Sequence, residues 1–219
     1  MMENIHRLIT EVAATTAGFT QEEVDFLVQN ITLPDFLDFG FDRGYKHVFI
    51  PVSNFGYSPT AACINYRRAV NDNDLLFLAK AAHYMQDLSC VFHTIWNNQN
   101  YHKFYEWKAE NMVDDIQANL SVDPVVIDHV YVQSVELAEI SETYAEELLN
   151  ALYIGDDDTI YNVSLACVNN AIGYTLGMYQ KFFEDTVSGI RYSIPIEGSI
   201  NAPMIGAAAV FIIMAGVYL

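Results

Sequence analysis

Apolar side chains recur at helical spacing along most of the chain. This period predicts amphipathic helices over residues 3–16 and near 100–119. The segment TQEEVDFLVQNI predicts another helix, because Thr20 is followed three residues later by Glu23, the arrangement of a capping box. A longer helix is predicted for the segment DDDTIYNVSLACVNNAIGYTLGMYQKFFEDTV, whose acidic start suits the helix dipole.

The middle of the chain alternates helical patterns with polar and irregular segments. Two helices are predicted from Pro59 to about Val70 and from about Asp74 to Leu88. Residues 32–59 are rich in Gly, Pro and aromatic side chains and predict a long ordered loop. Because long loops in compact domains tend to carry function, this loop is a candidate part of a site.

The C-terminal segment is apolar and uncharged. No charged residue follows Glu197, and the run from Ala202 to Leu219 contains 18 residues, long enough to span a bilayer. The pattern predicts a single all-α domain over residues 1–190, a neck over 191–201 and a transmembrane anchor over 202–219. The alternative is that the last segment forms a buried helix of the core.

Composition indicates a folded and strongly acidic protein. The chain has 219 residues, 52% of them hydrophobic, which suits one sizeable domain with a core. It has 28 acidic and 10 basic residues, a net charge of −18, so its surface repels polyanions. A phosphate-ester substrate would therefore need local positive charge, which bound metal ions could supply. The alternative is that the acidic surface only keeps the protein soluble and says nothing of a substrate. Cys63, Cys90 and Cys167 form no Cys-x-x-Cys motif and are predicted to be small buried side chains.

Candidate chemistry is concentrated around HYMQDLSCVFH, residues 83–93. His83 and Asp87 are four residues apart, so a helix places them on one face, where they could share a metal ion. His93 follows just past the predicted helix end, and His102 with Glu106 repeats the four-residue spacing on the next helix. Apolar flanks predict that the first pair is buried and needs partners. A hydrogen-bonded network without metal is the alternative.

The pattern His-Tyr-x-x-Asp-x5-His followed by His-x-x-x-Glu resembles the zinc-dependent phospholipase C family, which is related to the fungal single-strand-specific zinc nucleases. The resemblance implies an all-α fold and two or three zinc ions. It implies that His83 and Asp87 bind the paired ions, with Asp87 bridging them. It also implies that His93, His102 and Glu106 hold the more separate ion.

The resemblance extends upstream to the segment LPDFLDFGFDRGYKHVFIP and to the first helix. It implies that His47 and His6 are ligands, together with one acid of the loop. Asp35, Asp38 and Asp42 all fit loosely. We select Asp35, which follows the proline at the loop start, as a metal ligand. We also select it as the catalytic residue, whose carboxylate orients or deprotonates the attacking water.

The chain departs from the family at its start. The family binds its third zinc through an N-terminal Trp, whereas this chain begins Met1-Met2 with no Trp nearby. Either a longer precursor is processed, or the third metal is held differently or is absent.

The resemblance implies a zinc-dependent phosphodiester hydrolase. A phospholipase C that releases diglyceride and a phosphorylated headgroup is favoured, because Glu106 is the last ligand and six positions separate Asp87 from His93. A single-strand nuclease or nucleotidase and a non-catalytic membrane-anchored metal-binding protein are the alternatives. The expected partners are phospholipid and membrane rather than nucleic acid. We expect the anchored domain to face outside the cytoplasm, with a cytoplasmic orientation as the alternative.

Overall fold

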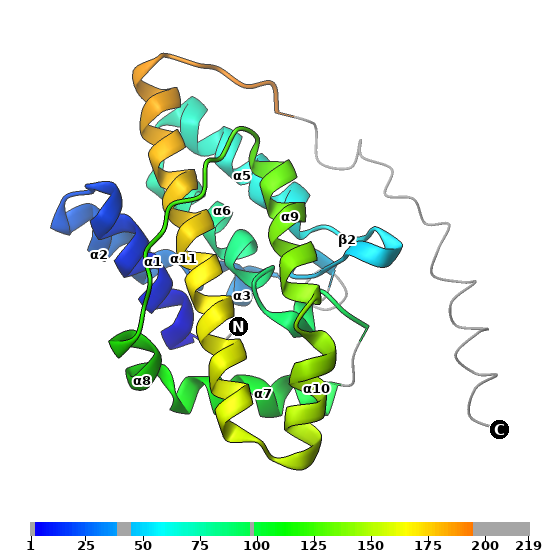
Figure 1. The fold of residues 1–219 in the computed structure, drawn as a ribbon. Coiled ribbons are helices and arrows are strands. Elements are labelled where there is room, and N and C mark those ends of the chain that lie inside the picture. Colours follow the sequence, from blue (N-terminus) through cyan, green and yellow to red (C-terminus); the bar gives the residue numbers. More distant parts are fainter. Residues whose placement is uncertain (1–2, 39–44, 97–98, 195–219) are drawn as a thin grey trace.

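The computed structural model describes residues 3–38, 45–96 and 99–194 (Figure 1). Helices dominate these residues, which confirms the expected all-α class. The helices are α1 (Glu3–Ala17), α2 (Gln21–Asn30), α3 (Leu33–Leu37), α5 (Ser58–Asp72), α6 (Leu75–Asp87), α7 (Gln99–Asn111), α8 (Val113–Ala118), α9 (Val130–Glu142), α10 (Ala145–Ile154) and α11 (Asp157–Val187). Two 3-10 turns, Pro51–Ser53 and Val91–His93, and two short strands, β1 (Phe49–Ile50) and β2 (Phe55–Gly56), complete the described fold.

Local side-chain chemistry fixes where several helices begin. The predicted capping box is present: the Thr20 hydroxyl accepts from the Glu23 backbone, and the Glu23 carboxylate accepts from the Thr20 backbone. Asp74 caps α6 by accepting from the Leu76 backbone N–H at 2.7 Å. Asp156 caps α11 in the same way. These caps satisfy N–H groups that the helices themselves cannot pair.

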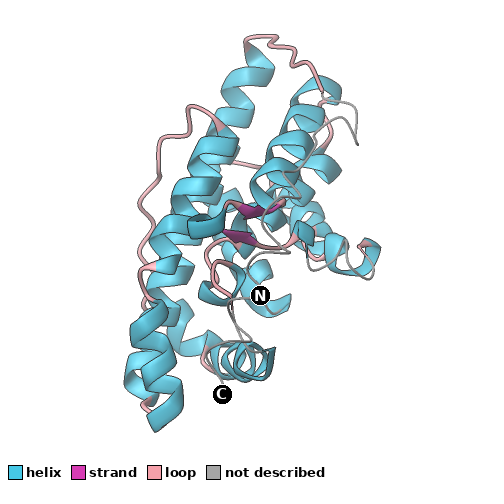
Figure 2. Ribbon diagram, turned by 90° about the vertical axis from the view of Figure 1, so that its right-hand side faces the viewer, coloured by secondary structure: helices cyan, strands magenta, loops and turns pink. Residues whose placement is uncertain are grey.

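The segment predicted as a loop contains more regular structure than expected. Pro34 occupies the first turn of α3, where the missing N–H costs nothing, so a short helix forms inside the segment. Further on, β1 and β2 pair antiparallel, with Phe49 opposite Gly56. In Figure 2 this hairpin lies among the helices near the middle of the molecule. It leads directly from the loop into α5.

The long helix α11 runs through the domain and packs against α1, α5, α6, α9 and α10 (Figure 1). The segment before α9 crosses α11 closely, and the Val125 N–H donates to the Gly173 carbonyl at 3.1 Å. A Cβ atom at Gly177 would lie 1.8 Å from the Val125 carbonyl oxygen, so this crossing requires glycine. Helix α6 packs on α2, α5 and α11, and this buried position explains why its polar side chains need internal partners.

The chain beyond α11 returns to the domain. The Asn71 side chain donates to the Tyr192 carbonyl at 2.8 Å, and the hydroxyls of Tyr66 and Tyr192 both donate to Asp185 at 2.6 Å. The predicted anchor over 202–219 and the neck beyond residue 194 lie outside the described residues. Within the described part of the chain, no helix combines the length and apolar character needed to cross a membrane.

Candidate metal centre

The eight predicted ligands come from separate parts of the fold and meet in two adjoining groups. The first group consists of His6 on α1, Asp35 on α3, His47 in the turn before β1, and His83 and Asp87 on α6. The second consists of His93, in the 3-10 turn after α6, with His102 and Glu106 on α7. Every histidine selected from the sequence therefore lies in one of these groups.

Asp87 stands at the centre of the first group and is 1% exposed. Its Oδ2 lies 2.7 Å from His47 Nδ1 and 3.2 Å from His83 Nε2. Its Oδ1 lies 3.4 Å from His6 Nε2 and 3.3 Å from His93 Nδ1. Both oxygens of one buried carboxylate thus face imidazole nitrogens, an arrangement that demands protons or a metal cation between them.

The protonation states around Asp87 suit metal binding except at His47. Burial lowers the pKa of His47, but the nearby carboxylates, that of Asp87 foremost, outweigh burial and raise it, so a metal would have to displace a proton there. Burial alone would raise the pKa of Asp87, but the surrounding imidazoles, His83 foremost, hold it well below its usual range, so the carboxylate is ionised. Burial lowers the pKa of His83, and it lowers the pKa of His93 to about 4. Neutral imidazole and ionised carboxylate are the forms that coordinate metals.

Gln86 sets the tautomer of His6. The Gln86 amide nitrogen donates to the Thr10 hydroxyl at 3.0 Å, which directs the amide oxygen toward His6 Nδ1 at 2.8 Å. His6 Nδ1 therefore carries the proton, and Nε2 presents a lone pair. This Nε2 is completely buried, faces Asp87 and has no hydrogen-bond partner among the described residues. A ligating histidine shows the same pattern, with one nitrogen held by a neighbour and the other free for the ion.

His47 and His83 bring a third acid to the first group. His47 Nδ1 lies 3.1 Å from His83 Nε2, and Asp35 Oδ1 lies 3.9 Å from the former and 3.7 Å from the latter. The Asp35 side chain is 28% exposed, so it borders solvent while the imidazoles are buried. These three donor atoms could hold a metal ion between them.

Asp35 and Asp38 occupy opposite sides of the His47 ring. Asp38 Oδ2 lies 3.3 Å from Nε2, the nitrogen that points away from Asp87. Asp38 is itself fixed by the Tyr84 hydroxyl at 2.7 Å and by Lys46 at 3.0 Å. The geometry therefore favours Asp35 as the acid on the donor side and places Asp38 at ion-pair distance from the opposite nitrogen, without a hydrogen bond to it. The third acid considered, Asp42, lies outside the described residues.

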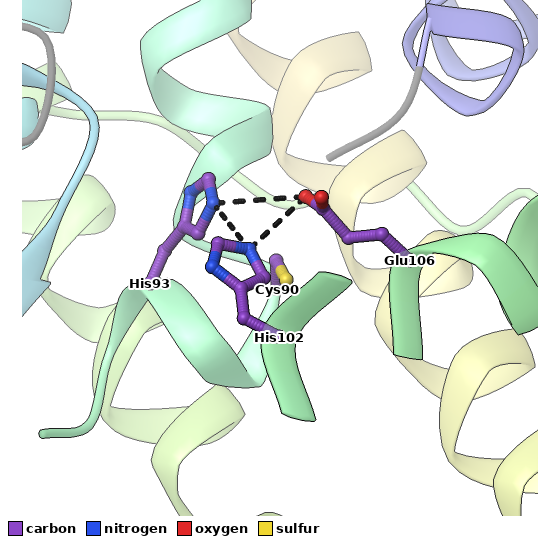
Figure 3. A group of neighbouring side chains, drawn as sticks. All are labelled: Cys90, His93, His102 and Glu106. Carbon is purple, nitrogen blue, oxygen red and sulfur yellow. Dashed lines mark hydrogen bonds and ion pairs between the residues drawn. The ribbon is translucent and has the colours of Figure 1, made fainter. Parts of the chain in front are cut away.

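The second group is compact (Figure 3), and its His102 and Glu106 side chains are partly exposed while Cys90 and His93 are buried. His102 Nε2 lies 3.1 Å from His93 Nε2 and 3.0 Å from Glu106 Oε1. Burial lowers the pKa of His102, but hydrogen bonds with Cys90 and Glu106 outweigh burial and raise it to about 9. The pKa of Glu106 is held below its usual range despite burial. Without a metal, a proton on His102 balances the acid.

Sequence reasoning missed two side chains of this centre. Cys90, expected to be a small buried residue, places its sulfur in the second group, with all four donor atoms within 4.8 Å of one another. The sequence feature that could have identified Cys90 is the Cys-x-x-His spacing of CVFH, which suits a shared metal ion. A search for paired cysteines overlooks this spacing. Gln86 gives no such signal, because its role depends on Thr10 from another helix. The sixth histidine, His129, lies outside both groups and is exposed at the start of α9.

No family model matches this chain, and the search of curated proteins found no significant match.

Proposed function

We propose that this protein is a zinc-dependent phosphodiester hydrolase, and that its preferred reaction is the phospholipase C cleavage of glycerophospholipids to diglyceride and a phosphorylated headgroup. The observation that carries the proposal is the convergence of His6, His47 and His83 on both oxygens of the buried Asp87. In a metal-free network, His6 Nε2 has no hydrogen-bond partner among the described residues. Leaving such a buried group unsatisfied costs about 1–3 kcal/mol.

The donor set and its spacing support zinc. Zinc prefers imidazole nitrogen, carboxylate oxygen and thiolate sulfur, at about 2.0–2.3 Å. Two such N or O donors on one tetrahedral ion lie roughly 3.3 Å apart, a value that follows from those bond lengths. The pair of His47 Nδ1 and His83 Nε2 lies at 3.1 Å, and the pair of His83 Nε2 and Asp87 Oδ2 at 3.2 Å.

The first group would bind the phosphodiester. His6, Asp35, His47, His83 and Asp87 are the proposed ligands, and bound zinc would supply Lewis acidity toward phosphate oxygens and lower the pKa of water toward neutrality. Asp35 is the proposed general base, because its partly exposed carboxylate faces the donor nitrogens of His47 and His83 from the solvent side. From that side it can orient the attacking water and accept its proton.

Surface features support lipid over nucleic acid. The net charge of −18 opposes a long polyanion, whereas a single phosphodiester at a lipid surface meets mainly the local positive charge of the centre. Large apolar side chains are exposed near the ligands along the chain: Phe36 and Leu37 come directly after Asp35, and Trp96 comes three positions after His93. Such side chains suit contact with acyl chains and the membrane interface.

The proposal includes the membrane anchor over 202–219, with the helical domain outside the cytoplasm. An anchor would hold the centre near its substrate. This part rests on the apolar run of the sequence alone.

The test compares two substrates on the purified full-length protein. We expect release of diglyceride from phosphatidylcholine vesicles, loss of that release with a chelator, and recovery with zinc. Degradation of single-stranded DNA instead would favour the nuclease alternative, and bound zinc without either reaction would favour the non-catalytic one. His83→Ala should abolish the reaction and the metal of the first group, while His129→Ala, at an exposed position outside the centre, should change neither.

A further inference from the structure

We infer that Cys90 is the fourth ligand of the ion held by His93, His102 and Glu106, so that the second group is a zinc site of one cysteine, two histidines and one glutamate with no vacant position. The inference rests on the proposed zinc content of the protein. It goes beyond the resemblance, which implies only three of these side chains as ligands.

The geometry that brings Cys90 into the group is local. Two short turns position the thiol: the Cys90 N–H donates to the Asp87 carbonyl at 3.0 Å, and the His93 N–H donates to the Cys90 carbonyl at 2.9 Å. Cys90 and His93 thus form one pair across the 3-10 turn, and His102 and Glu106 form a second pair one turn apart on α7. Figure 3 shows the sulfur beside the His102 ring, next to the triangle of dashed lines that joins His93, His102 and Glu106.

The four donors match zinc in chemistry and in number. All four donor atoms lie within 4.8 Å of one another. On a tetrahedral zinc ion, a sulfur and a nitrogen lie roughly 3.6 Å apart, which follows from bonds of about 2.3 and 2.0–2.1 Å. Small side-chain adjustments would therefore close the group around one ion. Thiolate also favours zinc over magnesium or calcium, which prefer oxygen.

Charge and burial favour the same assignment. Cys90 is 1% exposed and His93 is 6% exposed, so a net charge here would be costly. One thiolate and one carboxylate balance the two positive charges of zinc, and two neutral imidazoles complete the shell. The bound group is then electrically neutral. If only His93, His102 and Glu106 bound the zinc ion, Glu106 would balance one of its two positive charges. No ligand would balance the other one.

A closed shell changes what this ion does. Zinc with four protein ligands is typical of structural sites, whereas catalytic sites keep one position open. The ion would tie the turn after α6 to α7 across the segment that joins them. Since His93 Nδ1 also faces Asp87 Oδ1 at 3.3 Å, the ion would fix one wall of the first group. The phosphodiester chemistry would be confined to the Asp87 group.

Cys167 provides a matched control. It is also buried and belongs with Cys90 to the lining of one small cavity, together with Tyr105 and Glu106. Within the described part of the chain, Cys167 belongs to no group of donor atoms close enough together to hold an ion. A thiolate signal from this region should therefore depend on Cys90 and not on Cys167.

The test is the ultraviolet absorption of the full-length protein loaded with Co²⁺ in place of zinc. We expect a thiolate-to-cobalt charge-transfer band in the wild type and in Cys167→Ser, and its loss in Cys90→Ser, which should still bind cobalt at the Asp87 group. A band that survives in Cys90→Ser, or cobalt bound to the wild type without any band, would overturn the inference and leave the proposed function standing. Failure to bind cobalt at all would overturn both. If Cys90→Ser does not fold, X-ray absorption at the zinc edge of the wild type decides, because a sulfur shell at about 2.3 Å is required.

Discussion

Asp87 Oδ2 lies 2.7 Å from His47 Nδ1, although 40 positions separate the two residues in the chain. This contact joins the loop before β1 to the end of α6, and it places one buried carboxylate between ligands from different elements. Asp87→Asn keeps the size of the side chain and removes its charge. We expect the variant to lose the metal of the first group and all hydrolytic activity, measured by zinc content after dialysis and by turnover. Full zinc content in this variant would contradict a ligand role for Asp87.

Gln86 is predicted to act through His6. Gln86→Leu removes the acceptor of the His6 Nδ1 proton and frees the ring to adopt the other tautomer. Loss of such an outer partner typically weakens metal binding by about 10–100-fold. A competition titration with a chromophoric chelator measures this change. Gln117→Leu, at an exposed position on α8, is the control and should bind zinc like the wild type.

Asp35 and Asp38 should differ in effect. Asp35→Asn is expected to lower kcat by about 10²–10⁴-fold through loss of the general base. Asp38→Asn should act mainly through the lost charge beside His47 and weaken zinc binding by about 10–100-fold. Turnover at saturating zinc separates the two, because added zinc should rescue only Asp38→Asn. Rescue of Asp35→Asn to wild-type turnover would exclude it as the base.

The metal-free protein should lose stability as the pH rises. The pKa of His102 is raised from 6.5 to about 9 in the fold, mainly by Cys90 and Glu106 against the effect of burial. Its contribution is therefore fully present below pH 6.5 and is lost as the pH rises through about 9. Thermal unfolding in chelator, between about pH 6 and 9.5, should show this loss in the wild type and less of it in His102→Gln. An equal loss in both would assign the pH dependence to other groups.

The same proton should make zinc binding depend on pH. Because zinc must displace the proton from His102 and also the proton of the coordinating Cys90 thiol, binding to the second group should release two protons at about pH 7 and tighten as the pH approaches 9. Calorimetry in buffers of different ionisation enthalpy counts the released protons. Release of a single proton, from a protein shown to bind through Cys90, would contradict the predicted state of His102.

Much of the fold and of the centre follows from local patterns in the sequence. The capping box at Thr20 is a short-range signal, and the spacing of His83 with Asp87 defines a helix face without knowledge of the rest of the chain. What the sequence leaves open depends on three-dimensional placement. Asp35 and Asp38 lie close together in the chain, but they reach different nitrogens of His47 because α3 ends between them.

The role of Cys90 also depends on three-dimensional placement. Leu88, Val91 and Phe92 around it are apolar and its side chain is buried, which is typical of a cysteine that only fills space. Its position beside His102 depends on the turn after α6 and on the way α7 packs against it. The sequence alone therefore does not show that Cys90 completes the second group. That becomes apparent only when the positions of the turn and of α7 are known.

The most direct test of the proposed metal centre is the metal content of the purified protein, measured by mass spectrometry of the metal ions alongside the His83→Ala and His129→Ala variants. We expect more than one zinc ion per chain in the wild type, fewer in His83→Ala, and unchanged content in His129→Ala. A folded wild-type protein that binds no zinc, even after incubation with the metal, would contradict the proposal.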